Sequence, residues 1–117
     1  MDSQLKTQQR RAFHRVRFPI AEQPRWMIGS TNFAVVELAE TSCRLALCGH
    51  EAIDLGQTWQ GMVQFADGDQ IWIEGTAIRL EHEAIVVRLA KGINFKKIIS
   101  LQRELHRKYP TLRELNP

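Results

Sequence analysis

Between Phe13 and Leu89 the chain is a succession of short segments rich in valine, isoleucine, tryptophan and phenylalanine, separated by turn-forming residues. Residues of these types are enriched in strands, and the segments are too short for typical helices. The Asp-Gly step in 66–70 supplies the positive φ that a tight turn needs, and 81–83 is expected to form the next turn. We predict strands near residues 16–22, 25–29, 33–39, 43–48, 59–65, 71–80 and 84–90.

This succession of short strands limits the folds open to the chain. Consecutive hairpins with few long loops predict an antiparallel sheet. Closing such a sheet removes its exposed edges, so a barrel or a sandwich is favoured. We therefore expect a mainly β protein, a small antiparallel β-barrel of six to seven strands, and the 117 residues suit a single domain of this kind.

The spacing of apolar residues changes near the end of the chain, from Asn94, where a side-chain N-cap is expected. The spacing predicts a C-terminal helix at about 95–109, before Pro110. We expect its apolar stripe to cover the core, with a membrane or a partner as the alternative occupant. The expected organisation is a flexible, arginine-containing segment at 1–12 followed by one domain at 13–117. The apolar positions of the helix are Phe95, Ile98, Ile99, Leu101, Leu105 and Tyr109.

The net charge of +3 is distributed unevenly along the chain. Residues 1–25 carry six basic against two acidic side chains, residues 26–90 three against nine, and residues 91–117 seven against two. An acidic middle disfavours the binding of duplex nucleic acid along the whole domain. A local anion site fits this distribution better.

Several classes of protein are disfavoured by composition. No stretch approaches the roughly 20 apolar residues of a membrane span, and the N-terminus lacks the apolar core of a secretion signal, so we expect a cytoplasmic protein. Cys43 and Cys48 are five residues apart on a predicted strand and would lie on opposite faces, and the four histidines are scattered. We expect neither a metal site nor an enzyme, because no catalytic signature is present.

Arginines are concentrated just before and at the start of the first predicted strand, in Arg10-Arg11-Ala12-Phe13-His14-Arg15-Val16-Arg17. A guanidinium group is planar, permanently charged and carries five donors, so clustered arginines suit phosphate oxygens and the acceptor edge of guanine. A solvated tail or a non-specific nucleic-acid arm is the alternative interpretation. A nucleotide is the ligand that these residues favour.

The order of an RxxxR segment (Arg11 to Arg15, preceded by Arg10), a small barrel and a helix resembles the PilZ domain, a bacterial receptor for cyclic di-GMP. The resemblance covers about residues 10–109, and 92–95 is similar to the family's glycine-apolar-x-Phe segment. It implies that Arg11 and Arg15 hold phosphates and guanine edges, with Arg10 as an auxiliary contact. The implied ligand is cyclic di-GMP, without a cofactor.

The family's second motif, (D/N)xSxxG, is matched to Glu40-Thr41-Ser42-Cys43-Arg44-Leu45, where only the serine is identical. Glu40 keeps an acceptor for guanine N–H groups on a longer side chain. Leu45 replaces a glycine that would leave room for the ligand, which argues against tight binding. Ser42 is expected to donate to a phosphate or a base, with a local backbone cap as the alternative. Arg44 is either a further phosphate ligand or a solvated strand residue.

Three functions follow as hypotheses. The first is a cyclic di-GMP receptor that changes conformation and signals to an unidentified protein effector, as a monomer or weak homodimer. The second is a PilZ-fold protein-interaction module that does not bind the nucleotide. The third is an RNA or single-stranded DNA binder, which the acidic middle disfavours. We expect no membrane partner and no specific nucleic acid.

Overall fold

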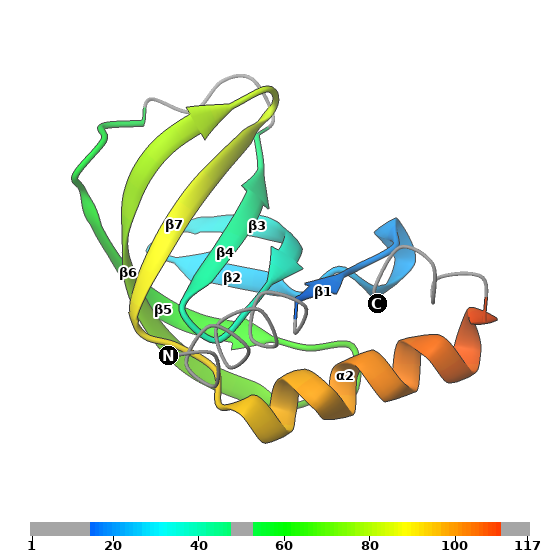
Figure 1. Ribbon diagram of the computed structural model, residues 1–117. Helices are drawn as coiled ribbons and strands as arrows, with labels where there is room; N and C mark the ends of the chain where they lie inside the picture. Colours follow the sequence, from blue (N-terminus) through cyan, green and yellow to red (C-terminus); the bar gives the residue numbers. More distant parts are fainter. Residues whose placement is uncertain (1–14, 48–52, 111–117) are drawn as a thin grey trace, which may run out of the picture.

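The strands wrap into a barrel whose open end lies over the C-terminal helix (Figure 1), in a computed structural model that describes residues 15–47 and 53–110. The segment 1–12, which carries Arg10 and Arg11, lies outside the described residues. The elements are β1 (Val16–Arg17), a 3₁₀ helix η1 (Ile20–Glu22), β2 (Arg25–Ile28), β3 (Thr31–Leu38), β4 (Ser42–Ala46), β5 (Thr58–Gln64), β6 (Gln70–Glu81), β7 (Ala84–Lys91) and α2 (Phe95–Lys108).

The expected antiparallel barrel with a C-terminal helix is confirmed. The strand order is β1-β3-β2-β5-β6-β7-β4, and an additional β3–β4 pairing closes six strands, with β1 added beside β3. Every pairing is antiparallel. The predicted turns join β5 to β6 and β6 to β7, with positive φ at Gly68 (95°) and Glu83 (59°).

The predicted strand at 16–22 is wrong beyond Arg17. Pro19 has no N–H to donate to a strand ladder and forms the N-cap of η1 instead. The backbone of Phe18 still donates to the carbonyl of Val36 at 3.0 Å, so the chain leaves β3 only at the proline. Arg15 therefore directly precedes a two-residue strand that pairs with β3, and Arg17 is the second residue of that strand.

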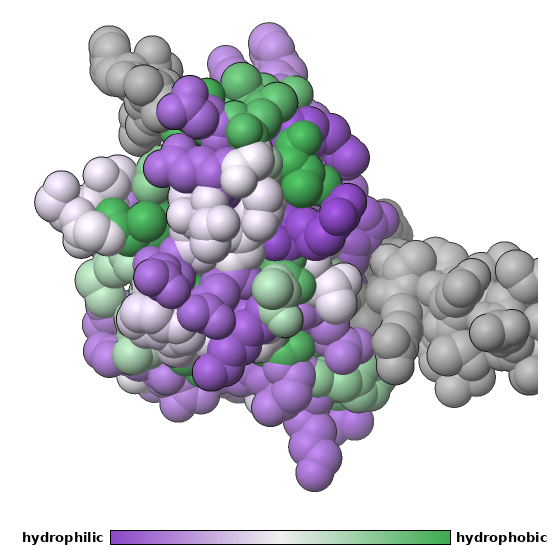
Figure 2. Space-filling view, turned by 90° about the vertical axis from the view of Figure 1, so that its left-hand side faces the viewer, coloured by the Kyte–Doolittle hydropathy of each residue, from purple (hydrophilic) through white to green (hydrophobic). Residues whose placement is uncertain are grey.

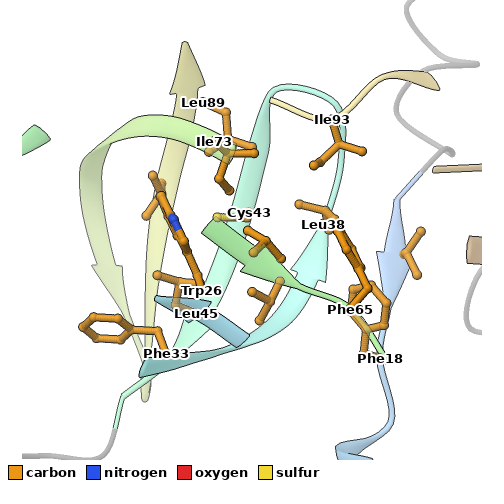
Figure 3. Packing of buried hydrophobic residues seen from close by; sticks show 14 of the residues in the cluster. Phe18, Trp26, Phe33, Leu38, Cys43, Leu45, Phe65, Ile73, Leu89 and Ile93 are labelled. Atoms are coloured by element: carbon orange, nitrogen blue, oxygen red, sulfur yellow. The ribbon is translucent and has the colours of Figure 1, made fainter. Parts of the chain in front are cut away.

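The core fills the interior of the barrel. Figure 3 shows Trp26, Cys43, Leu45 and Ile73 turned inward from the strands of the barrel wall. Leu45 and Ile73 are fully buried, as expected where inward positions of a small barrel are filled by side chains.

The helix α2 adds a second part of the core at the open end of the barrel. Ile98 and Leu105 are buried, so its apolar stripe covers the protein's own core, as predicted. The Asn94 side chain accepts a hydrogen bond from the Lys97 N–H at 2.9 Å, which confirms the expected N-cap. The helix ends at Lys108, one residue before the predicted end.

The surface mixes residue types. On the face shown in Figure 2, hydrophobic side chains lie in small groups between hydrophilic ones, which is usual for a protein surface. Within 15–47 and 53–110, no helix combines the length and the apolar character that crossing a membrane requires.

Candidate functional site

Arg15, Ser42 and Arg44, which are separated in the sequence, line one pocket of about 90 Å³ on the outside of the barrel. Glu37 from β3 and Arg79 from β6 line the same pocket. The strand order explains why these residues lie close together, because β4 lies between β3 and β7, and β7 pairs with β6. The structure thus brings together three of the six residues that the sequence singled out.

Alternation along β4 decides which side chains point to the outside of the barrel. Cys43 and Leu45 are buried in the interior, so Ser42 and Arg44 point outward. Leu45 does not line the pocket. The expectation that this leucine occupies space needed by a ligand is therefore not supported by its position.

Two irregularities in the strand pairing turn charged residues toward the pocket. In β3, Phe33 and Val35 face inward, and simple alternation would direct Glu37 inward as well. The register shifts between Val35 and Glu37, so that Glu37 pairs with the outward-facing Arg44. β-bulges of this kind occur often beside functional sites because they redirect a side chain.

The second shift lies in β6, between Ala77 and Arg79. Ala77 is buried like Ile73, and alternation would direct Arg79 into the core as well. After the shift Arg79 pairs with Val86, which in turn pairs with Arg44. One outer row of the barrel therefore runs from Glu37 through Arg44 and Val86 to Arg79.

Two carboxylates connect the arginines of this row. Glu37 lies between two guanidinium groups, with 3.4 Å from its Oε1 to Arg15 Nε and 3.6 Å from its Oε2 to Arg44. Glu81 is 3.2 Å from Arg44 and 2.9 Å from Arg79. The hydrogen bond from Arg79, together with the charges of Arg44 and Arg79, lowers the pKa of Glu81 despite an opposing effect of desolvation. Glu81 therefore stays ionised through the neutral pH range.

Glu37 is the most buried charged group of the pocket. Its side chain is 9% exposed, against 54% for Arg15 and 36% for Arg44. Its Oε1 atom and the Nε atom of Arg44 are buried without a hydrogen-bond partner among the described residues. Both contacts of Glu37 are thus long ion pairs, and the pocket retains polar atoms whose hydrogen-bonding capacity is unused.

Glu40 does not line the pocket and lies in the turn between β3 and β4. A Cβ atom built on Gly92 would lie 1.9 Å from the Glu40 carbonyl oxygen, so only glycine permits this approach of the two backbones. Gly92 belongs to the 92–95 segment recognised in the sequence. Its position explains the glycine as a packing requirement beneath the turn that leads into Ser42.

The sequence analysis did not identify Glu37 and Arg79. The (D/N)xSxxG pattern read three residues earlier places Glu37 at its acidic position, but this frame matches the pattern less well than the one that begins at Glu40. Ala39 then takes the serine position and Ser42 the glycine position. The motif therefore gave no signal for Glu37, because the Glu40 frame has the same acidic residue and also keeps the serine. Arg79 had no signal either, because its direction depends on the bulge.

The buried thiol of Cys43 is not suited to catalysis or to metal binding. Burial raises its pKa to about 12, which keeps it protonated at neutral pH. Cys48 lies outside the described residues. Within the described ranges, no three His, Cys, Asp or Glu side chains are placed to hold a metal ion.

Comparisons with known proteins give a likeness of fold. No family model matches the chain. No curated protein matches it either. Among solved structures, the crystal structure of an uncharacterized Legionella protein is similar, with a TM-score of 0.55 and 14% identity over 80% of this chain and 95% of that chain. At this identity the likeness concerns the fold alone.

Proposed function

We propose that this protein is a PilZ-type receptor for cyclic di-GMP. The observation that supports this most is the meeting of Arg15, Ser42 and Arg44 in one pocket, although they come from two separate stretches of the chain. These are the stretches in which the PilZ resemblance expects ligand contacts. Arg10 and Arg11 precede Arg15 by a few residues and would add further guanidinium groups when the nucleotide binds.

Arg15 is placed so that it can exchange its carboxylate partner for a ligand phosphate. Arg15 is half exposed and contacts Glu37 at 3.4 Å without a hydrogen bond to that carboxylate oxygen. A phosphate offers a guanidinium two parallel hydrogen bonds, which are stronger than a long ion pair near water. A phosphate of cyclic di-GMP would thus replace Glu37 as the partner of Arg15, while Glu37 remains the partner of Arg44.

A hydrogen bond between α2 and Arg15 links the pocket to the helix, so that ligand binding could change the surface that a partner recognises. Gln102 of α2 donates a hydrogen bond to the Arg15 carbonyl oxygen at 2.9 Å. A ligand that repositions Arg15 therefore acts on the contact between β1 and α2. We propose that a protein effector in the cytoplasm reads this change, because binding that orders one element supplies the two states of a switch.

The second candidate is a PilZ-fold interaction module that does not bind the nucleotide. It is favoured by one observation, namely that Glu37 and Glu81 already neutralise part of the charge of Arg15, Arg44 and Arg79. In this case the exposed guanidinium groups would contact acidic side chains of a protein partner.

Isothermal titration calorimetry at moderate salt, with cyclic di-GMP as ligand and GMP and GTP as controls, separates the two functions. The receptor function predicts saturable binding of cyclic di-GMP. Arg11→Ala, Arg15→Ala and Arg44→Ala should each weaken it about tenfold or more, since a hydrogen bond to a charged group contributes about 1.5–3 kcal/mol. Arg25→Ala, an exposed arginine of β2, and Lys96→Ala are the matched controls. If no heat of binding is detected at about 100 μM cyclic di-GMP, the interaction module is favoured. If RNA binds more tightly than cyclic di-GMP, the hypothesis of an RNA or single-stranded DNA binder is favoured.

A further inference from the structure

The acidic middle of the chain contributes its few basic residues to one surface. Between residues 26 and 90 the sequence contains Arg44, Arg79 and Arg88 as its only lysines or arginines. Arg44 and Arg79 line the pocket on the outside of the barrel. Arg88 lies on β7, where its Cα is paired with that of Ser42, another pocket residue. Strand pairing has therefore collected three scattered cations on the outer side of β4, β7 and β6.

Two neighbouring rows of this surface differ in their charge balance. The first row holds Arg44 and Arg79, and Glu81 forms ion pairs with both. The second row runs from Ser42 through Arg88 to Thr76. Arg88 is paired with Ser42 of β4 on one side and with Thr76 of β6 on the other. Within 15–47 and 53–110, Arg88 forms no ion pair, so none of these residues neutralises its charge.

The environment of Arg88 matches the needs of a phosphate. Residues paired across neighbouring strands have Cβ atoms about 4.5–5.5 Å apart, so the hydroxyl groups of Ser42 and Thr76 flank the base of the arginine. Hydroxyl and guanidinium groups together offer donors to several oxygens of one phosphate. Alternation along the strands turns these three residues to the outside, while their neighbours Cys43, Val87 and Ala77 are buried.

We propose that Arg88, with Ser42 and Thr76, forms a second phosphate subsite next to the one at Arg15 and Arg44. This inference rests on the proposed binding of cyclic di-GMP, whose two phosphates require two sets of donors. Arg79 lies on the same outer side of the sheet, in the row whose charge Glu81 partly neutralises. The subsite accounts for the position of Arg88, an arginine with no carboxylate partner in the part of the chain that the structure describes, within a segment that has three basic against nine acidic side chains.

Calorimetry with cyclic di-GMP on the full chain tests this subsite. Arg88→Ala and Arg88→Gln should weaken binding about tenfold, and Arg88→Lys should recover part of the loss, because a lysine restores charge without the paired donors. Arg25→Ala is the control for the loss of one exposed arginine and should stay within about twofold. Thermal unfolding of each variant checks that the fold is retained, as expected for an exposed side chain.

The outcomes separate the subsite from the proposed function. Binding by the unmodified protein that is weakened by Arg88→Ala and Arg88→Gln but not by Arg25→Ala supports the subsite. Binding that is equally strong in the Arg88 and Arg25 variants overturns the subsite and leaves the receptor function standing. A failure of the unmodified protein to bind cyclic di-GMP overturns both.

Discussion

The side-chain amide of Gln102 in α2 donates a hydrogen bond of 2.9 Å to the backbone carbonyl oxygen of Arg15. Gln102 is a buried polar residue, with 7% of its surface exposed. A buried glutamine is stable only when its polar atoms are paired, so this bond fixes the start of β1 against the helix. The position of Arg15 in the candidate pocket thus depends on α2.

Replacing Gln102 by leucine should therefore affect both stability and binding. Loss of the donor leaves the Arg15 carbonyl without this partner, at a cost of about 1–3 kcal/mol in the free energy of unfolding. Urea denaturation measures this cost, and calorimetry should show weaker binding of cyclic di-GMP. Arg103→Ala, one residue along on the exposed side of α2, is the control and should leave both quantities nearly unchanged. A Gln102→Leu variant as stable as the parent would show that the bond contributes nothing.

Leu45→Gly should destabilise the protein rather than improve ligand binding. Leu45 is fully buried, and removal of its side chain leaves a cavity in the barrel and adds backbone freedom to β4. We expect a loss of about 3–5 kcal/mol in the free energy of unfolding. Leu80→Gly, at a position with 51% exposure on β6, is the matched control and should cost much less. A Leu45→Gly variant that is stable and binds cyclic di-GMP more tightly would contradict the placement of this residue in the core.

Gly92→Ala should disturb the turn that leads into the candidate pocket. The added Cβ would meet the Glu40 carbonyl oxygen at 1.9 Å, and this oxygen belongs to the backbone, so it cannot move aside as the end of a flexible side chain could. We expect lower thermal stability and weaker binding of cyclic di-GMP, because Ser42 is two residues from Glu40. The neighbouring Lys91→Ala should change neither. Normal stability of Gly92→Ala would mean that the two backbones separate at little cost.

The contact between Lys97 and the turn that joins β5 to β6 should make stability depend on acid pH. Lys97 Nζ lies 2.8 Å from Asp67 Oδ2 and 4.7 Å from the centre of the Phe65 ring, and it also contacts Asp69. Desolvation raises the pKa of Asp67, but the hydrogen bond from Lys97 with the remaining interactions lowers it below the ordinary value of 3.8. Stability from this carboxylate is therefore present above that value and is lost as the pH falls through the lowered pKa.

Lys97→Met removes the charge and keeps most of the apolar length, so its stability should fall less steeply with pH below about 4. Thermal unfolding at a series of pH values between about 2 and about 7 measures the difference. Lys96→Met, at the exposed neighbouring position, should retain the pH profile of the parent. Identical acid profiles for Lys97→Met and the parent would contradict the role of this ion pair.

The barrel and the helix were predictable because their signals are local. Asp67-Gly68 marks a turn, and the spacing from Asn94 to Leu105 marks an amphipathic helix with its N-cap. The end of β1 was predicted wrongly because the apolar residues around Pro19 resemble a strand. The proline has no N–H to donate to a neighbouring strand, so the strand ends before it.

The candidate site was predictable only in part. Arg15, Ser42 and Arg44 were named from the sequence, but Glu37 and Arg79 were not, since alternation places both in the interior. Their outward directions depend on two register shifts, which arise from the pairing of β3 with β4 and of β6 with β7. Pairing between distant segments is not encoded in the local pattern of either strand.

The central claim is that cyclic di-GMP binds at the pocket formed by Arg15, Ser42 and Arg44. Titration of the ¹⁵N-labelled protein with cyclic di-GMP, followed by two-dimensional NMR of the backbone amides, tests it most directly. We predict that the amide signals of these three residues shift in a saturable manner, while those of Arg25 on β2 do not. Unchanged spectra at saturating ligand, or shifts confined to residues away from the pocket, would contradict the claim.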